Sequence, residues 1–325
     1  MEDFYERMKE QQIKYKESVL GIEEMGKWRG RPYPHILPEE KWSLNLWEGV
    51  REEAQHYFEQ NQIAWHRYRH NMLSSQAMCV NIFFPLKQHL DVFKPWLLGK
   101  FPDVEKVTSL DFEYIGPQGK DYFNEKGGRG QNRTSSDICI TWEDEQRKKN
   151  MLLLEFKFTE RDFGVCSRRE GQDDNLCRNS EKIVASPQTQ CYRAQVGRTY
   201  WEYILRNDSP FKLKALTTES YCPFRYDFYQ LMRNQLLAHC IQSDREAGLH
   251  RVEFGVIHHA DNEALLRMGH AFSGERDPFK AWPTLLKNPN TFHVFTVQDF
   301  LYTVEAKLPT KLANWRTYLK QRYGS

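Results

Sequence analysis

The chain of 325 residues lacks any uninterrupted apolar run that approaches membrane-spanning length. A transmembrane helix needs about 20 apolar residues, and a secretory signal peptide needs an apolar stretch behind a basic start. The first residues, MEDFYERMKEQQIKYKE, are instead charged throughout. These absences exclude a membrane-spanning helix and a signal peptide, so we expect a soluble protein of the cytoplasm that does not act on membranes.

The sequence also lacks an excess of charge of one sign, since 46 Lys and Arg stand against 44 Asp and Glu. A formal net charge of +2 excludes strong overall attraction to polyanions, which would have to bind at local clusters of cations. One such cluster is KGGRGQNR (126–133), where Arg129 and Arg133 lie in a glycine-rich loop whose backbone could approach phosphate groups. The alternative interpretation of this loop is a flexible, solvated connection.

A second cluster, KWRGRPYPH (27–35), interleaves basic and aromatic residues. Surfaces that stack on bases or contact phosphates often have this composition. Trp28 and Tyr33 equally fit an aromatic staple that holds an N-terminal segment against the body, which is the interpretation we favour.

Several catalytic motifs are absent. There is no Gly-Lys-Ser/Thr phosphate loop, no Gly-x-Ser-x-Gly elbow and no dinucleotide fingerprint, which argues against ATP-driven translocation and serine hydrolysis. There is no internal repeat and no low-complexity linker either. Hydrophobic residues make up 40% and aromatic residues 14%, which is ample for a core. We expect one domain over 1–325, with a helical extension over 1–70 and a core over 71–325.

The most informative segment that is present is TSSDICITWEDEQRKKNMLLLEFKFTE (134–160). It reads as two strands joined by a polar turn, because apolar residues alternate on either side of EDEQRKKN. One predicted face is apolar, with Ile138, Ile140 and Trp142 on the first strand and Leu152, Leu154, Phe156 and Phe158 on the second. The other face carries Asp137, Cys139 and Thr141 on the first strand and Met151, Leu153, Glu155 and Lys157 on the second.

A hairpin centred on Gln146 places Asp137 opposite Glu155, because 137 and 155 sum to twice 146. Directly opposed side chains on one face of a sheet lie roughly 5 Å apart. Both carboxylates and Lys157 would therefore meet in one patch, on what we expect to be the solvent-facing side of the sheet. The alternative is an ordinary surface pair of Glu155 and Lys157 beside an edge acid.

Two ionised carboxylates at such a short distance repel each other unless a positive charge lies between them. Mg²⁺ (or Mn²⁺) is the usual solution, held by one or two carboxylates together with waters and substrate phosphates. Lys157 could orient or deprotonate a metal-bound water, or neutralise charge that develops on a phosphate. This is a minimal set of groups for hydrolysing a phosphodiester.

At these residues the sequence resembles the PD-(D/E)xK nuclease superfamily. The resemblance extends to one bacterial branch of restriction-endonuclease-like proteins over the stretches YPHILPEE (33–40), AWHRYRHNMLSSQAMCVNIFFPL (64–86), YQLMRNQLLA (229–238) and VIHHADN (256–262). It implies metal-dependent cleavage of DNA. By this resemblance Asp137, Glu155 and the backbone carbonyl of Phe156 would hold the metal, and Lys157 would position or activate the water.

The order of predicted elements agrees with the α/β fold of that superfamily, an αβββαβ core with a mixed central sheet flanked by helices. We expect helices over 1–25, 43–60, from Ser74 onward, 188–206, 225–241 and 311–323, strands over 104–114, the hairpin, 211–219 and 251–259, and a loop over 26–38.

Many relatives carry a third acid on the helix before the first core strand, where this sequence has Gln76. Gln76 could orient a metal-bound water or ligate through its carbonyl oxygen, or belong only to a helix-capping turn. Gln188-x3-Tyr192 resembles a pattern that lies near the active site of RecB-like members and can contact DNA. The alternative is that Tyr192 is a core aromatic.

Four of the seven cysteines follow the hairpin, namely Cys166, Cys177, Cys191 and Cys222. Some RecB-like nucleases hold an iron–sulfur cluster with cysteines flanking the fold, and a metal would order the polar insertion over 161–187. The spacings between these four cysteines are wide, and no Cys-x2-Cys pair is present. Zinc is the less favoured occupant of such a site.

We therefore expect a Mg²⁺-dependent nuclease acting on DNA, of a restriction or defence type. A RecB-like repair or processing exonuclease and a catalytically weak nucleic-acid-binding module are the alternatives. Cleavage of both strands at a palindrome would suggest a homodimer by symmetry, and a defence role would bring partner proteins.

Overall fold

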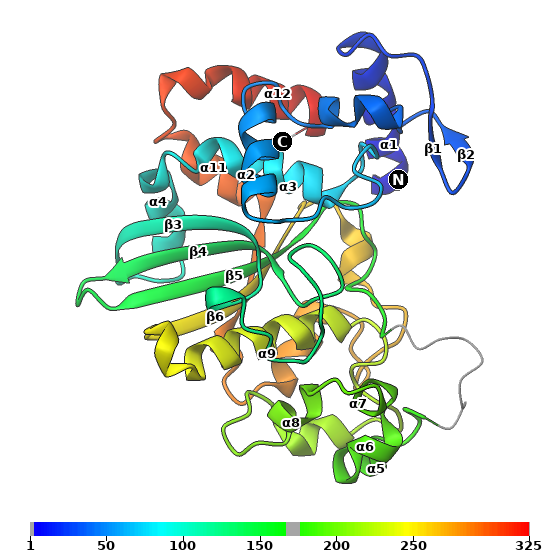
Figure 1. Cartoon of the computed structure of the whole chain (residues 1–325), viewed down its shortest axis with the longest axis vertical. Coiled ribbons are helices and arrows are strands. Elements are labelled where there is room, and N and C mark those ends of the chain that lie inside the picture. Colours follow the sequence, from blue (N-terminus) through cyan, green and yellow to red (C-terminus); the bar gives the residue numbers. More distant parts are fainter. Residues whose placement is uncertain (1–2, 167–175, 325) are drawn as a thin grey trace.

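A five-stranded sheet lies in the middle of the molecule in a computed structural model that describes residues 3–166 and 176–324 (Figure 1). Its strand order is β3-β4-β5-β6-β7, with β3, β4 and β5 antiparallel and β6 and β7 parallel to β5. The bounds are Val104–Tyr114 (β3), Ser136–Asp144 (β4), Lys149–Lys157 (β5), Arg251–His258 (β6) and Phe292–Thr296 (β7). A mixed sheet between helices confirms the predicted restriction-endonuclease-like fold.

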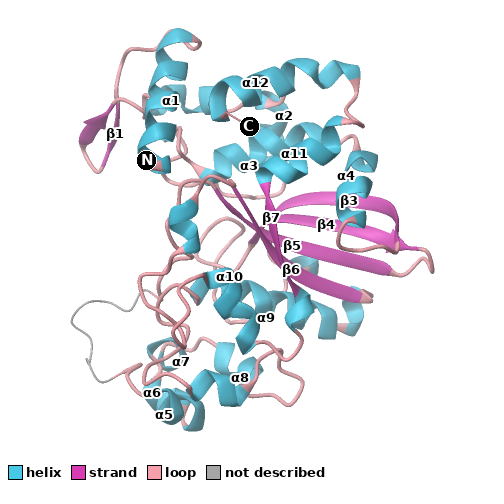
Figure 2. Ribbon diagram, turned by 180° about the vertical axis from the view of Figure 1, so that it is seen from behind, coloured by secondary structure: helices cyan, strands magenta, loops and turns pink. Residues whose placement is uncertain are grey.

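Helices cover both faces of this sheet, as the view from behind shows (Figure 2). One layer consists of α1 (Phe4–Ser18), α2 (Arg51–Gln60), α3 (Ser75–Phe83), α4 (Phe93–Leu98), α11 (Val297–Glu305) and α12 (Ala313–Tyr323). The other consists of α5 (Ser180–Ala185), α6 (Pro187–Gln190), α7 (Tyr192–Gln195), α8 (Tyr200–Ile204), α9 (Tyr229–Ser243) and α10 (Pro278–Ala281). The order α3, β3, β4, β5, α9, β6 is the predicted αβββαβ core.

The alternation of the hairpin residues is confirmed, but the prediction of a solvent-facing side is wrong. Ile140 and Leu154 belong to the core beneath the first helical layer. Cys139, Met151 and Leu153 belong to a second core, which includes Leu236 of α9. A strand that pairs in parallel is normally covered on both faces, and these side chains are too apolar to be left in water. The acids therefore lie between the sheet and a helix.

The predicted hairpin register is confirmed. Ile138 pairs with Leu154 and Cys139 with Leu153, so each pair sums to twice 146. Asp144 closes the turn because one of its carboxylate oxygens accepts hydrogen bonds from the backbone N–H groups of Gln146 and Lys148, both at 2.9 Å. This Asp turn takes the place of the Asn-Gly pair that the segment lacks.

Several predicted boundaries near the N-terminus are wrong. The helix expected over 1–25 ends at Ser18, and the loop expected over 26–38 contains a two-stranded hairpin, β1 (Gly26–Trp28) and β2 (Arg31–Tyr33). The extension over 1–70 is therefore not wholly helical. The helix expected over 43–60 begins only at Arg51, because the backbone N–H of Trp47 donates to Asn81 Oδ1 at 2.7 Å instead of to a preceding turn.

Two further elements differ from the prediction. The region 188–206 forms three short helices, since Cys191 is extended (φ −119°, ψ 119°) and separates α6 from α7. The strand expected over 211–219 is a 3₁₀ helix over Leu213–Thr217, and Leu213 is 37% exposed, so the period-two burial of a strand is not followed. The helix from Ser74 is confirmed, because the Ser74 hydroxyl accepts from the N–H of Ala77.

Within residues 3–166 and 176–324, none of the helices combines the length and the apolar character needed to cross a membrane.

Candidate active site

Three neighbouring strands each place one acid on the sheet face that α9 covers. Ile138 pairs with Leu154, which sets Asp137 opposite Glu155. On the other side, pairs that flank Glu113 join Phe112 to Ile138 and Tyr114 to Ser136, which sets Glu113 opposite Asp137. Glu113, Asp137 and Glu155 therefore form a row across β3, β4 and β5, which we call the acid row.

The sequence analysis missed Glu113, although a signal existed. In LDFEY (110–114) the apolar Leu110 and Phe112 face the first core. Strand alternation places Glu113 on the opposite face, which the hairpin analysis had assigned to Asp137. The third acid of this site thus lies on the first core strand and not on the helix before it.

Gln76 is brought to the acid row, where it holds Glu113. Its amide Nε2 donates to Glu113 Oε1 at 2.8 Å, and the Ser135 hydroxyl donates to Glu113 Oε2 at 2.8 Å. The other side of the Gln76 amide is also engaged, since its Oε1 accepts from the backbone N–H of His66 at 2.8 Å. Gln76 therefore orients an acid in this structure, and its predicted contact with a metal or a water stays a prediction.

The acid row is electrostatically unfavourable without a cation. Burial raises the pKa of Asp137 well above its ordinary value, and the negative charges of Glu155 and Glu113 raise it further. Burial also raises the pKa of Glu113, against the opposing effect of the hydrogen bonds from Ser135 and Gln76. Asp137 Oδ2 accepts from the backbone N–H of Phe156 at 2.7 Å. Its other oxygen accepts no hydrogen bond from the described residues.

Glu155 and Lys157 form a buried ion pair that α9 holds from above. Glu155 Oε1 lies 3.0 Å from Lys157 Nζ, and their side chains are only 7% and 5% exposed. Asn234 Nδ2 donates to Glu155 Oε2 at 2.7 Å, and Lys157 Nζ donates to Gln230 Oε1 at 2.7 Å. Gln230 and Asn234 are four residues apart, so they project from the same side of α9. Both were missed, although they are polar positions one turn apart in a helix that was predicted.

The acids around Lys157 raise the pKa of its ammonium group. Burial lowers the pKa of Lys157, but the negative charges of Glu155, Glu160 and Asp137 outweigh it and raise the pKa to about 12. A lysine in this state donates hydrogen bonds and neutralises negative charge. The raised pKa of Lys157 in the metal-free protein favours charge neutralisation over proton acceptance, and both predicted roles stay predictions.

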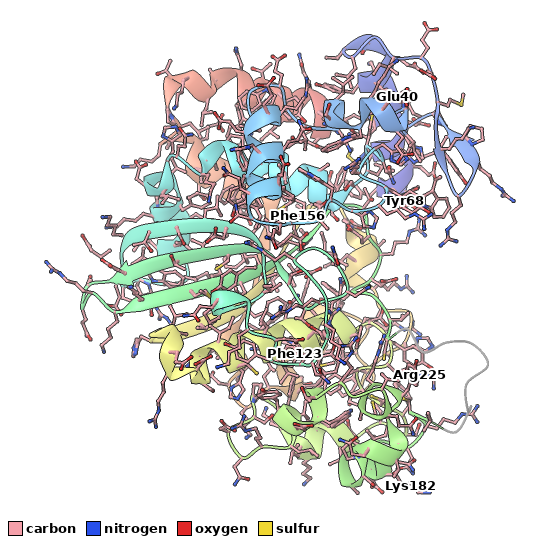
Figure 3. All side chains as sticks on the ribbon, viewed as in Figure 1. Glu40, Tyr68, Phe123, Phe156, Lys182 and Arg225 are labelled. Atoms are coloured by element: carbon pink, nitrogen blue, oxygen red, sulfur yellow. The ribbon has the colours of Figure 1, made fainter. Side chains whose placement is uncertain are left out.

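A cavity of about 720 Å³ opens onto the acid row. All three acids and Lys157 line it, together with residues of the β1–β2 hairpin, of the start of α3 and of the segment between them: Trp28, Tyr33, His35, His66, Tyr68, Ser74, Ser75 and Gln76. Figure 3 labels Tyr68 and Phe156 in this part of the molecule. The acids are thus the floor of an open cavity and not part of a sealed core.

A smaller cavity of about 180 Å³ reaches the acid row from the side of the glycine-rich loop. Arg133 lines it and also donates to the carbonyl of Gly119 at 2.7 Å, and its predicted contact with a DNA phosphate stays a prediction. Arg129 lines neither cavity. Its guanidinium donates to the backbone carbonyls of Glu113 (3.1 Å) and Phe112, so it fastens the loop to the end of β3.

Gln188 and Tyr192 are not brought to the acid row. They lie on α6 and α7 and line neither of these cavities. Figure 3 shows Lys182, on the neighbouring α5, at the end of the molecule far from Tyr68. Their predicted contact with DNA stays a prediction, and α9 supplies the side chains over Lys157 and Glu155 instead.

Backbone hydrogen bonds link the chain segments that carry three of the four cysteines of the predicted cluster, Cys177, Cys191 and Cys222. Cys177 N–H donates to the carbonyl of Gln190 beside Cys191, and Cys222 N–H donates to the carbonyl of Cys177, both at 3.1 Å. All are free thiols, with Cys166 half-buried and the others buried. A hydrogen bond from the Cys177 thiol lowers the pKa of Cys191 to about 6. Residues 167–175 of the predicted insertion 161–187 lie outside the described residues.

Within the described ranges, no three His, Cys, Asp or Glu side chains are grouped closely enough to form a ready-made metal site. The iron–sulfur or zinc prediction therefore stays a prediction. Mg²⁺ makes a smaller demand, because one or two carboxylates suffice when waters and a substrate phosphate complete its coordination. The carboxylates of Asp137 and Glu155 are buried and offer only oxygen atoms as ligands. One oxygen of Asp137 accepts no hydrogen bond from the described residues, so the pair fits that requirement.

Comparison with known families gives one finding. The model of a family described as restriction endonuclease associating with ARP matches residues 8–324, nearly the whole chain. No curated protein and no solved structure matches this chain.

Proposed function

The chain belongs to the family of restriction endonucleases associating with ARP (REase-ARP), and on that premise we propose that it is a metal-dependent nuclease of the PD-(D/E)xK type that hydrolyses DNA phosphodiester bonds. Family membership supports the coarser part of this proposal, a nuclease of a defence type with DNA as its substrate. The acid row with its buried lysine is the observation that carries the finer part.

In this proposal Asp137, Glu155 and the backbone carbonyl of Phe156 hold Mg²⁺ or Mn²⁺. When bound, the metal would polarise the scissile phosphate and lower the pKa of a coordinated water. Lys157, charged and buried, stabilises the negative charge that develops on the phosphate oxygens. Its position is held by Gln230, and that of Glu155 by Asn234.

Gln76 acts through Glu113 in this proposal, and Arg133 neutralises a phosphate of the bound strand. The contact of Gln76 with Glu113 at 2.8 Å supports the first role. The place of Arg133 on the smaller cavity beside the acids supports the second. Gln188 and Tyr192 would touch DNA only if the strand continued past α9 toward α6 and α7.

We expect purified protein to cleave supercoiled circular DNA in Mg²⁺ or Mn²⁺ but not in EDTA, and a Glu155→Gln variant to leave the circle intact. Linear duplex and single-stranded DNA are tested in parallel. Cleavage of linear DNA alone would favour the RecB-like exonuclease, because a circle has no free end. Binding without a product at any metal concentration would favour the nucleic-acid-binding module and contradict the proposal.

Two partner proposals accompany the nuclease. The family description supports a protein partner through the words "associating with ARP", in line with a defence system of several proteins. A homodimer is the simplest way to cut both strands at a palindrome, and the mass of the protein in solution, alone and with DNA, would test it.

We also propose an iron–sulfur cluster at Cys166, Cys177, Cys191 and Cys222. Protein purified without oxygen should then contain iron and acid-labile sulfide and absorb visible light. A Cys191→Ser variant should lose all three signals, while Cys240→Ser, which changes another buried thiol, should keep them. Wild-type protein without stoichiometric iron would contradict the cluster, and stoichiometric zinc would point to the less favoured occupant.

A further inference from the structure

We propose that the β1–β2 hairpin and the segment 66–70 form a docking surface for unpaired DNA, on which bases stack beside the acid row. We call the two segments together the aromatic wall. This inference rests on the proposed function and deepens it, because it names the form of DNA that the site accepts.

The aromatic wall is one side of the cavity that opens onto the acids. Trp28, Tyr33 and Tyr68 line this cavity and are half-buried. Trp28 meets Tyr33 at 6.0 Å (71°) and Tyr68 at 6.1 Å (63°), both edge to face. In an edge-to-face pair the ring that presents its edge keeps its own faces free of that partner. Because Arg29 and Arg67 lie over the Trp28 and Tyr68 rings, a base would stack on the other ring face or displace the guanidinium.

The aromatic wall is fastened to the rest of the protein, although its two parts are distant in sequence. His70 Nε2 lies 3.0 Å from the backbone carbonyl of Lys27, and the N–H of Leu37 donates to the carbonyl of His70 at 3.0 Å. The N–H of Gly26 donates to the carbonyl of Ile36 at 2.8 Å. These bonds tie the hairpin to the segment that leads into α3, so the rings keep a defined position over the cavity.

Charge along the aromatic wall matches a nucleic acid. The β1–β2 hairpin (26–33) and the segment 66–70 contain no Asp or Glu, although acids nearly equal bases in the whole chain. They contain Lys27, Arg29, Arg31, Arg67 and Arg69. The exposed Arg29 guanidinium lies 4.7 Å from the Trp28 ring centroid, and that of Arg67 lies 5.5 Å from the Tyr68 ring centroid. Cations beside aromatic rings can bind phosphates while the rings take bases.

The depth of the acids argues for an unpaired strand. Glu155 and Lys157 are 7% and 5% exposed at the floor of a cavity of about 720 Å³, a volume within the usual range of small-molecule pockets. In a duplex the faces of each base are covered by its neighbours, so the rings of the wall would have nothing to stack on. A frayed, flipped or single-stranded nucleotide can meet the rings and still bring its phosphate to the floor.

The test measures binding of the full chain in EDTA, where cleavage is blocked, to fluorescent oligothymidylate alone and paired with oligoadenylate. We expect the wild type to bind the single strand about 10-fold more tightly than the duplex. Trp28→Leu and Tyr68→Leu should each weaken single-strand binding about 10-fold, the usual scale of losing one stacked base. Trp28→Phe and Tyr68→Phe keep a ring and should stay near the wild type, as should Tyr302→Leu, which alters a tyrosine 82% exposed on α11.

The outcomes separate this inference from the proposed function. If the leucine variants bind the single strand as the phenylalanine variants do, or if the wild type prefers the duplex or binds neither DNA, the docking surface is refuted, whatever the nuclease assay shows. If binding depends on the rings but Mg²⁺ never produces cleavage, the docking surface stands and the nuclease is refuted.

Discussion

Replacing Asp137 by asparagine is expected to lower DNA cleavage by about 100- to 1,000-fold and to stabilise the metal-free protein at neutral pH. The loss of activity is the usual scale for removing one strong electrostatic group from an active site. Asparagine keeps an oxygen that can accept from the N–H of Phe156, a bond of 2.7 Å in the wild type, so the strand pairing is preserved. It removes one negative charge from the acid row.

The pH dependence of this stabilisation follows from the raised pKa of Asp137. Burial, with the charges of Glu155 and Glu113, raises it above the ordinary value of 3.8. Between 3.8 and the folded-state pKa the folded protein binds more protons at Asp137 than the unfolded chain, so this residue makes the wild type less stable as the pH rises through that window. The advantage of Asp137→Asn should therefore be absent below about pH 4 and grow toward neutral pH.

Unfolding by urea in EDTA at acid and neutral pH, together with cleavage assays in Mg²⁺, measures both effects. Asp111→Asn is the matched control, because Asp111 lies on β3 two residues from Glu113 and lines neither cavity at the acid row. It should cleave DNA as the wild type does. An Asp137→Asn variant that unfolds, or that cleaves normally, would show that Asp137 is structural.

Replacing Lys157 by methionine is expected to abolish most cleavage and to lower the free energy of unfolding by about 3–5 kcal/mol, the typical cost of removing one partner of a buried ion pair. The Glu155 side chain, 7% exposed, would remain buried without the cation that lies 3.0 Å away. Methionine fills a volume similar to that of the lysine stem, so packing against Phe163 is kept while the charge is lost.

The double variant Glu155→Gln/Lys157→Met separates stability from activity. It removes both members of the ion pair, and the glutamine side chain introduced by Glu155→Gln could still accept from Asn234, so much of the lost stability should return while cleavage stays absent. The exposed pair Lys41 and Glu24, at 3.4 Å, is the control, because Lys41→Met should cost at most about 1 kcal/mol. If Lys157→Met were as stable as the wild type, the buried pair would not be maintained in solution.

The charged state of Lys157 also limits the chemistry of the site. In the metal-free protein the neighbouring acids raise the pKa of Lys157 to about 12, which favours a role in donating hydrogen bonds and neutralising charge over a role as a base. The base in a metal-assisted hydrolysis would then be a carboxylate of the acid row or the substrate phosphate itself. Glu113 is the carboxylate best placed for further study, because Gln76 and Ser135 already fix its orientation.

The opposition of Asp137 and Glu155 could be predicted because it depends on local rules. Side chains in a strand alternate with period two, and a short turn sets the register of both arms. The pairing of Ile138 with Leu154 follows from that alone. Glu113 obeys the same alternation on β3 and could have been found by the same reasoning. Neighbouring strands therefore specify the acid row.

The covering of that row could not be predicted, because it depends on how distant segments pack. Gln230 and Asn234 are separated from Lys157 by more than seventy residues, and only the docking of α9 brings them to 2.7 Å from Lys157 and Glu155. The same docking makes the second sheet face a core and not a surface. The sequence by itself determined the hairpin of β4 and β5, its register and the acids that these two strands present, since these are short-range properties of the backbone. Only the tertiary structure decided that the acids are buried, that they raise the pKa of the lysine and that an aromatic wall stands beside them, because burial and charge coupling depend on which segments meet in space.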